Sequence, residues 1–223
     1  MGASGGFPID LVLFGMIAAF LVLRLRSVLG KRTGLERQAP PVQSGSARPA
    51  NGPIIEAKAE PPLPAASQSM PDANSPTGQA LAGMHALDRT FDPARFLAGA
   101  DQAFRMIVAA FAAGDRVVLR SLLSDETYSA FEQAITSREK VDEQQFSEIK
   151  SMHMLGIESA ELKGRVGSIL VRIVSDQISH TSDRDGKPLT GTDAVTEITD
   201  LWTFERDLGQ PDPAWRLVAA RSG

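Results

Sequence analysis

The chain has 223 residues and a formal net charge of -4, enough for one domain of ordinary size with further segments attached. The charge divides unevenly, because residues 88–223 carry 16 Lys and Arg against 22 Asp and Glu. This acidic balance argues against nucleic acid as a partner, since nucleic-acid binding needs cations that neutralise phosphates. The chain contains no cysteine, which excludes disulfides, thiolate metal ligands and a cysteine nucleophile.

Residues 7–25 predict a membrane-spanning helix. Asp10 is the only acidic residue in this apolar stretch, and a helix of its length is about 28 Å long, close to the hydrocarbon thickness of a bilayer. Basic residues lie at the end of the stretch and after it, and none precedes it: Arg24, Arg26, Lys31, Arg32 and Arg37. The positive-inside rule then predicts residues 1–6 outside the cytoplasm and the rest of the chain inside it.

A cleaved signal peptide is the competing interpretation of residues 7–25. It requires basic residues before the apolar core and a small-x-small cleavage site soon after it. No basic residue precedes the core, and no such site follows it before Gly34. A helix buried in the domain is less favoured, because a long polar segment separates the stretch from other apolar sequence. We therefore expect a single-pass membrane protein, with Arg24, Arg26, Lys31 and Arg32 placed to contact anionic lipid headgroups.

Residues 26–87 predict a basic juxtamembrane segment followed by a disordered linker. Nine prolines lie between Gln38 and Gly83, among Ser, Gly and Ala and few large apolar side chains. Such a stretch cannot bury enough surface to offset its backbone entropy. A linker of this kind raises the local concentration of an attached domain near the membrane.

The first part of residues 88–223 predicts three helices. Asp92 and Pro93 start the first helix as cap and first residue, and Gly114 ends it. Asp115 caps a short second helix, and Ser124 opens a third. The first helix has an apolar stripe at helical spacing, formed by Phe96, Ala100, Ala103, Phe104, Ile107, Val108 and Phe111.

The second part of the domain predicts strands, because its apolar pattern changes to a period of two. Gln144 and Gln145 lie in the joint between the two parts. Four antiparallel strands are expected within residues 147–162, 166–180, 192–206 and 214–220. Helices followed by strands indicate an α+β fold, in which an apolar helix face and an apolar sheet face must meet.

Three parts of residues 88–220 resemble a known family. They are residues 91–115, residues 122–131, and residues 199–206 with 212–219. In order and spacing they resemble the Tim44-like domain, which is the C-terminal domain of subunit forty-four of the mitochondrial inner-membrane translocase. The resemblance is closer to bacterial TimA-type relatives, which carry one N-terminal membrane segment.

The resemblance implies both a fold and a function. The implied fold is cone-shaped and similar to nuclear transport factor two, with about three helices across a curved four-stranded antiparallel sheet and an apolar pocket. The implied protein is a non-enzymatic adaptor at a bacterial inner membrane, with its domain in the cytoplasm. It would bind a protein or peptide partner, with lipid as a second ligand class, in protein translocation, membrane-protein assembly or quality control. The resemblance does not extend to the region with which the mitochondrial protein contacts its Hsp70 motor.

Six apolar residues are the expected lining of the pocket where a partner binds: Phe104, Ile107, Phe111, Ile173, Trp202 and Phe204. The alternative interpretation of Trp202 and Phe204, which share a strand face, is that they belong to the core and hold the sheet to the helices. Trp215 lies beside a loop, where packing of the strand end is expected.

A small-molecule-binding or lyase- or isomerase-like enzyme, using the same pocket, is the alternative function. Asp200 is its candidate catalytic acid, but we favour a structural role in which Asp200 pairs with one of three arginines: Arg172, Arg206 or Arg216. We therefore expect no catalytic residue.

The histidines give no sign of a metal centre. His85 lies in the predicted linker, while His153 and His180 lie on separate predicted strands. No spacing typical of metal ligands joins them. We therefore expect neither a metal site nor a cofactor.

Overall fold

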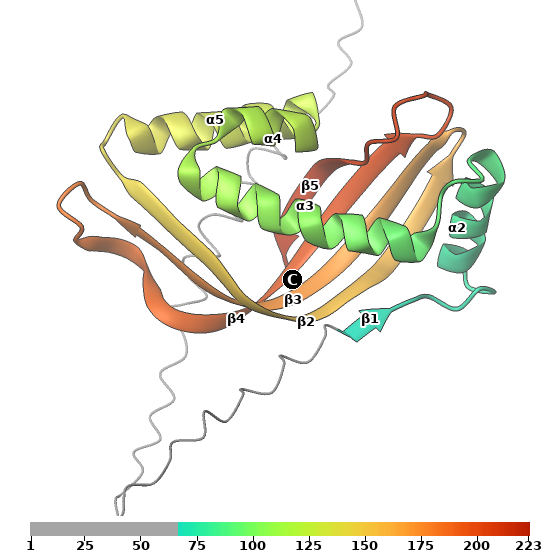
Figure 1. Ribbon diagram of the computed structural model, residues 1–223, viewed down its shortest axis with the longest axis horizontal. Helices are drawn as coiled ribbons and strands as arrows, with labels where there is room; N and C mark the ends of the chain where they lie inside the picture. The colour runs from blue at the N-terminus through green and yellow to red at the C-terminus, as the bar shows by residue number, and fades with distance from the viewer. Residues whose placement is uncertain (1–66) are drawn as a thin grey trace, which may run out of the picture.

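The computed structural model describes residues 67–223, which form four helices and five strands (Figure 1). In chain order they are β1 (Ser67–Ser69), α2 (Pro76–Leu87), α3 (Pro93–Ala113), α4 (Arg116–Leu122), α5 (Asp125–Glu139), β2 (Gln144–Lys163), β3 (Val166–Ser182), β4 (Pro188–Asp207) and β5 (Arg216–Ser222). The predicted membrane span, its basic cluster and the predicted linker up to residue 66 lie outside the described residues.

The α+β class is confirmed, and the sheet has one strand more than predicted. Its order is β1-β2-β3-β4-β5, with β1 parallel to β2 and every other pair antiparallel. The prediction of a four-stranded, purely antiparallel sheet was therefore wrong at this edge. Gly156 is the reason that β1 can approach, because a Cβ on Gly156 would lie 2.8 Å from the Cβ of Ser69.

The fold begins before residue 88. Helix α2 has Ser75 as its N-cap, whose side chain accepts a hydrogen bond from the Gly78 amide, and it buries Leu81 and Met84. The prediction of a disordered linker was therefore wrong for residues 67–87. Most residues of this segment are small or polar, so its short apolar face has no recognisable periodicity.

The other three helices are confirmed, together with their caps. Asp92 accepts from the Arg95 amide, Asp115 from the amides of Val117 and Val118, and Ser124 from the Thr127 amide. Gly114 ends α3 with a φ of 72°, the left-handed conformation that glycine adopts without steric cost. Each helix boundary is thus fixed by a local hydrogen bond or by a glycine.

The first three predicted strands are longer than expected, and the last has the expected length but lies two residues later, at Arg216–Ser222. β2 and β4 each have 20 residues, and β2 includes Gln144 and Gln145, which were expected in the joint. Three register shifts interrupt the pairing of β2 with β3, between residues 149 and 151, 152 and 154, and 157 and 159. Such bulges bend and twist the strand that carries them.

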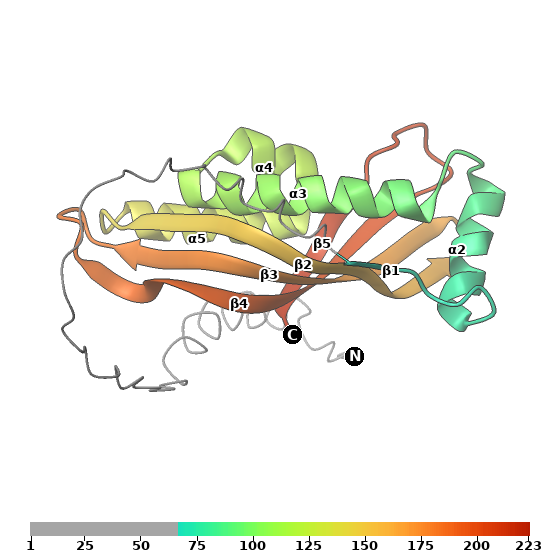
Figure 2. The same ribbon diagram turned by 60° about the horizontal axis from the view of Figure 1, so that its bottom comes forward.

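Helix α3 crosses the inner face of the curved sheet, and α4 and α5 lie on the same side of it (Figures 1 and 2). The apolar stripe of α3 packs on inward-facing strand residues, including Ile169, Val171 and Phe204. Among the described helices, α3 alone is long and apolar enough to cross a membrane. Its apolar residues, however, form the domain core, which accounts for its hydropathy.

Candidate functional site

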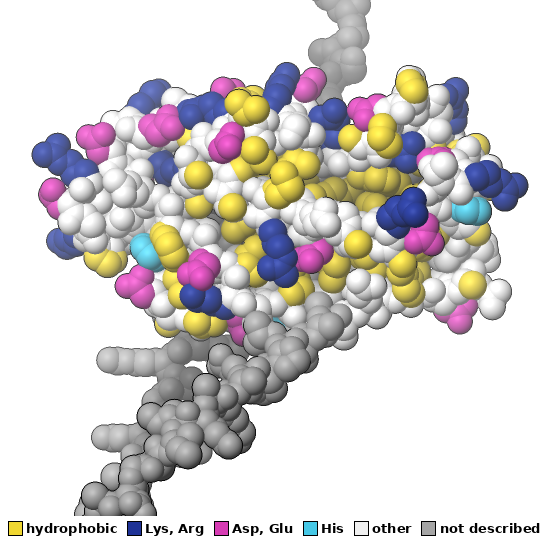
Figure 3. Space-filling view, viewed as in Figure 1, with side chains coloured by type: hydrophobic (Ala, Val, Ile, Leu, Met, Phe, Trp, Pro, Cys, Tyr) yellow, Lys and Arg dark blue, Asp and Glu magenta, His cyan; other side chains and the backbone are white. Residues whose placement is uncertain are grey.

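An open apolar cavity of about 410 Å³ lies at the α2 end of the domain, between α3 and the loop that joins β4 to β5. Figure 3 shows this recess lined by apolar side chains above the first turns of α3. The lining residues are Thr90, Phe91, Asp92, Arg95, Phe96, Gly99, Ala100, Ala103, Ser121, Leu122, Phe204, Arg206, Pro213, Ala214 and Trp215. We call it the aromatic cavity.

Four aromatic side chains from separate segments form its main wall. The ring of Phe96 lies 4.9 Å from that of Trp215 and 6.0 Å from that of Phe204, in edge-on arrangements. Phe91, from the loop before α3, lies 5.6 Å from Trp215. These distances are typical of favourable aromatic pairs, so the wall is packed although one side of it faces an open space.

The space exists because α3 presents small residues there. Gly99, Ala100 and Ala103 follow Phe96 on the cavity side of the helix. A Cβ added to Gly99 would meet no atom within 4 Å. Small side chains opposite large rings therefore leave a volume that no atom of the described domain fills.

Charged groups border the aromatic cavity. Arg206 forms an ion pair of 2.9 Å with Asp88, and only 11% and 14% of their side chains are exposed. Hydrogen bonds from Thr90, and secondarily the Arg206 charge, lower the pKa of Asp88. The Arg95 side chain is exposed at the border and has no ion pair within residues 67–223. The border thus carries two charged side chains that form no ion pair within residues 67–223, the Arg95 guanidinium and the Asp92 carboxylate that caps α3.

The six residues predicted from sequence as the pocket lining do not lie together around one cavity. Phe204 lines the aromatic cavity. Phe111 is half-buried and packs on Phe131 of α5, with its ring 5.1 Å away. The other four are at most 2% exposed and belong to the core: Phe104, Ile107, Ile173 and Trp202.

Sequence reasoning assigned Phe96 to the core stripe and Trp215 to strand-end packing, and it missed Phe91 as a lining residue. The signal that could have identified them is position rather than residue type. Phe96 lies in the first turn of α3 and Trp215 at the end of a loop, so both belong to the edge of the core rather than to its middle.

Asp200 lies away from the cavity and is 1% exposed. Its carboxylate accepts a hydrogen bond of 3.1 Å from Gln177, whose amide also bonds Ser175. The three arginines expected as its partners pair elsewhere, so that prediction was wrong: Arg172 with Glu158, Arg206 with Asp88 and Arg216 with Asp212. Alternation explains this for Arg172, which faces outward on its strand while Asp200 faces inward with Trp202.

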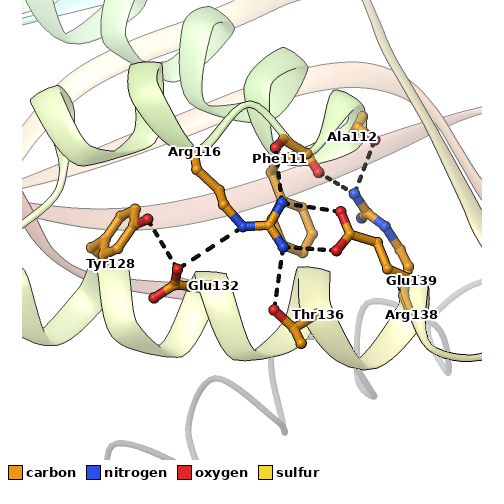
Figure 4. Close-up of polar contacts among 9 residues, drawn as sticks. Phe111, Ala112, Arg116, Tyr128, Glu132, Thr136, Arg138 and Glu139 are labelled. Atoms are coloured by element: carbon orange, nitrogen blue, oxygen red, sulfur yellow. Dashed lines mark hydrogen bonds and ion pairs between the residues drawn. The ribbon is translucent and has the colours of Figure 1, made fainter.

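A second polar cluster joins α3, α4 and α5 at the opposite end (Figure 4). Arg116 donates to both carboxylate oxygens of Glu139, at 3.0 and 2.7 Å, and this contact lowers the pKa of Glu139. Arg138 donates to the carbonyls of Phe111 and Ala112. These carbonyls belong to the last turn of α3, where the i+4 donors of the helix run out; the Phe111 carbonyl also accepts from the Gly114 amide at 3.3 Å. The cluster is therefore a structural joint between helices.

Together the fold and the cavity define an α+β domain whose helices cover one face of a mixed sheet and whose end opens as an aromatic-walled recess. Comparison with known families agrees with this class. The chain belongs to the Tim44-like domain family, whose model matches residues 77–222.

Two solved structures are among those found similar to the chain. The intermembrane space region of the chloroplast protein ARC6 has 11% sequence identity and a TM-score of 0.43, covering 59% of this chain and 97% of that one. A putative dehydratase of the NTF2-like family from Streptomyces avermitilis has 15% identity and a TM-score of 0.34, covering 55% and 92%. No curated protein matches the chain.

Proposed function

We propose that this chain is a non-enzymatic adaptor, anchored in a membrane, whose Tim44-like domain binds an apolar segment of a protein partner in the aromatic cavity. The observation that carries the proposal is the open wall of Phe91, Phe96, Phe204 and Trp215. Binding sites for apolar groups are concave, mostly apolar and largely preformed, and this cavity has all three properties.

Energetics favour an apolar partner segment over a polar one. Burying one Leu, Ile or Phe side chain contributes about 1.5–3 kcal/mol, and small residues on α3 leave room for such a side chain without rearrangement. Arg95 at the border can pair with an acidic group beside the apolar one, and the Asp92 carboxylate of the same border can pair with a basic group. Lipid is the second ligand class, because an acyl chain with an anionic headgroup has the same chemistry.

The membrane part of the proposal rests on sequence and family. Tim44-like domains occur in membrane-associated translocation or adaptor proteins. The apolar stretch 7–25 has Arg24 at its end and is followed by Arg26, Lys31 and Arg32. This pattern favours a single span in a bacterial inner membrane with the domain in the cytoplasm. The cavity would then meet partners at the membrane surface, in protein translocation, assembly or quality control.

Catalysis is the rival function. The Tim44-like family is non-enzymatic, and the candidate acid Asp200 is buried and does not line the cavity. A catalytic acid must reach the group that it protonates. If the chain were a lyase or isomerase, turnover of a small apolar metabolite by the purified chain would be lost in Asp200→Asn.

Site-specific photocrosslinking in cells tests the proposal. A photoreactive phenylalanine analogue replaces Ala214, which lines the cavity, or Ala98, which is exposed on α3 and does not line it. We expect discrete protein adducts from position 214 and few from position 98. Equal adduct patterns from the two positions would contradict the assignment of the cavity as the partner site.

A further inference from the structure

Three potential metal ligands meet on neighbouring strands, on the face of the sheet away from the helices. Asp176 of β3 lies opposite Glu197 of β4 in the register, and Ser151 of β2 lies opposite Asp176 on the other side. His153 follows two residues after Ser151. Residues Ser175 and Gln177 on either side of Asp176 are buried, so alternation directs Asp176 outward.

A β-bulge positions His153. Met152 pairs with Ser175 and Met154 pairs with Val174, which leaves His153 as the extra residue of β2. Bulges redirect the side chain that they carry. The result is a distance of 2.9 Å between His153 Nε2 and Asp176 Oδ2. One ligand atom from each of His153, Asp176 and Glu197 lies within 4.8 Å of the other two.

The electrostatics of this cluster favour a cation. Carboxylates directly opposite each other on adjacent strands repel, and Asp176 and Glu197 occupy such a pair. The nearby Lys150 pairs with Glu148, and Arg172 on the same face pairs with Glu158. Ser151 donates to Asp176 at 2.9 Å, the kind of contact that orients a ligating carboxylate.

We propose that His153, Asp176 and Glu197 form a binding site for a divalent transition-metal ion, with Zn²⁺ as the best match. One imidazole and two carboxylates are ligands that Zn²⁺ accepts at about 2.0–2.2 Å, with water at the remaining position. Mg²⁺ and Ca²⁺ prefer oxygen ligands alone. The His153 side chain is 43% exposed and that of Asp176 28%, so an ion can reach the site. Bound metal would fasten β2, β3 and β4 together.

The small number of histidines allows the proposed zinc site to be tested with few variants. The chain has three histidines and no cysteine, so zinc binding through an imidazole must use one of three residues. Purified full-length chain in detergent is titrated with Zn²⁺ alone and followed by calorimetry. We expect the wild type to bind one Zn²⁺ per chain. We expect binding to be at least about tenfold weaker in His153→Gln and in Glu197→Gln.

His180→Gln is the matched control. His180 also lies on a strand and also contacts a carboxylate, at 3.0 Å from Asp193, but it belongs to no three-ligand group in the described part of the chain. We expect unchanged zinc binding in this variant. Zinc should also raise the thermal unfolding midpoint of the wild type but not of His153→Gln. Absence of zinc binding by the wild type, or equal loss in His153→Gln and His180→Gln, would overturn the proposal.

Discussion

The two ends of one sheet face differ in the chemistry of their inner side chains. At the cavity end, the rings of Phe96, Phe204 and Trp215 face small residues of α3. At the other end, beneath α5 and along the β3–β4 hairpin, the inner residues are polar and hydrogen-bonded: Gln145, Ser147, Ser175, Gln177, Ser179 and Thr181.

The contrast between the two ends indicates where this fold can leave space for a partner. A buried polar group without a partner costs about 1–3 kcal/mol, so the polar end must satisfy its own hydrogen bonds. An apolar wall that faces an open cavity leaves no hydrogen bond unmade and forgoes only the hydrophobic stabilisation of the surface that stays uncovered. The cavity end can therefore remain open in the free protein and gain that stabilisation when an apolar segment enters.

The largest loss of stability should come from substitution of Trp202, whose ring lies in the core between the two ends. Trp202 is 2% exposed and packs on Phe104 at 4.7 Å, so Trp202→Ala should lower the free energy of unfolding by about 3–5 kcal/mol. Chemical denaturation measures this change. The indole N–H has no hydrogen-bond partner within the described range, so Trp202→Phe should cost much less. Equal losses in the two variants would contradict this account of the core.

A smaller loss is expected at the cavity wall. Trp215 is half-buried and contacts Phe91 and Phe96, so Trp215→Ala should cost about 2–3 kcal/mol. The same denaturation experiment compares it with Trp202→Ala. Crosslinking from position 214 should weaken in Trp215→Ala even where the variant remains folded. A folded variant with unchanged adducts would show that the aromatic wall does not bind the partner.

The polar end can be tested through Arg138, which joins α5 to the end of α3. Arg138→Met keeps the aliphatic packing but removes the donor to the carbonyls of Phe111 and Ala112. We expect a loss of about 1.5–2 kcal/mol in unfolding free energy. Arg105→Met is the control, because within residues 67–223 Arg105 forms only an exposed ion pair, with Asp101. This substitution should cost less than about 0.5 kcal/mol. Similar losses would argue against a structural joint.

A small gain is expected where the cavity borders α3. Gly99→Ala adds a methyl group into open space and reduces the flexibility of the unfolded chain, so stability should rise by about 0.5–1 kcal/mol. Gly78→Ala is the contrasting variant, because its added Cβ would lie 2.2 Å from the Asp72 carbonyl oxygen. It should destabilise the protein. A loss of stability in Gly99→Ala would contradict the description of the space as empty.

The smallest effect concerns pH. Ion pairs and hydrogen bonds lower the pKa values of Asp88, Glu139 and Glu158. Their contribution to stability is complete above the ordinary carboxyl pKa and is lost as pH falls through the lowered values. The thermal unfolding midpoint should therefore be level above about pH 5 and fall below about pH 4. Glu139→Gln should make the midpoint fall less steeply at low pH. The same pH dependence in wild type and variant would exclude the Arg116–Glu139 pair as a cause of the decline.

Much of the fold was predictable from local signals. Asp92, Gly114, Asp115 and Ser124 mark helix ends by cap chemistry, and each prediction holds. Alternation identified four strands. The missed elements, β1 and α2, lack such signals: Ser67–Ser69 has no apolar pattern, and α2 has only a short buried face. Their positions depend on contacts with β2, a strand that is distant from both of them in the sequence.

The site was less predictable because its parts come from separate segments. Phe96 and Phe104 lie on the same helical stripe, yet Phe96 borders the cavity while Phe104 is fully buried. Periodicity identifies the stripe but not which ring lies at its uncovered end. Likewise His153, Asp176 and Glu197 converge only through strand register and a bulge, neither of which the spacing of residues along the chain reveals.

Blocking the cavity tests the central claim most directly. Gly99→Trp places a large side chain toward open space at the cavity wall, and Gly99→Ala is the matched variant that leaves the cavity open. With the photoreactive analogue at position 214, adducts formed in cells should persist in Gly99→Ala and disappear in Gly99→Trp. Adducts of the same size and yield in both variants would contradict partner binding in the aromatic cavity.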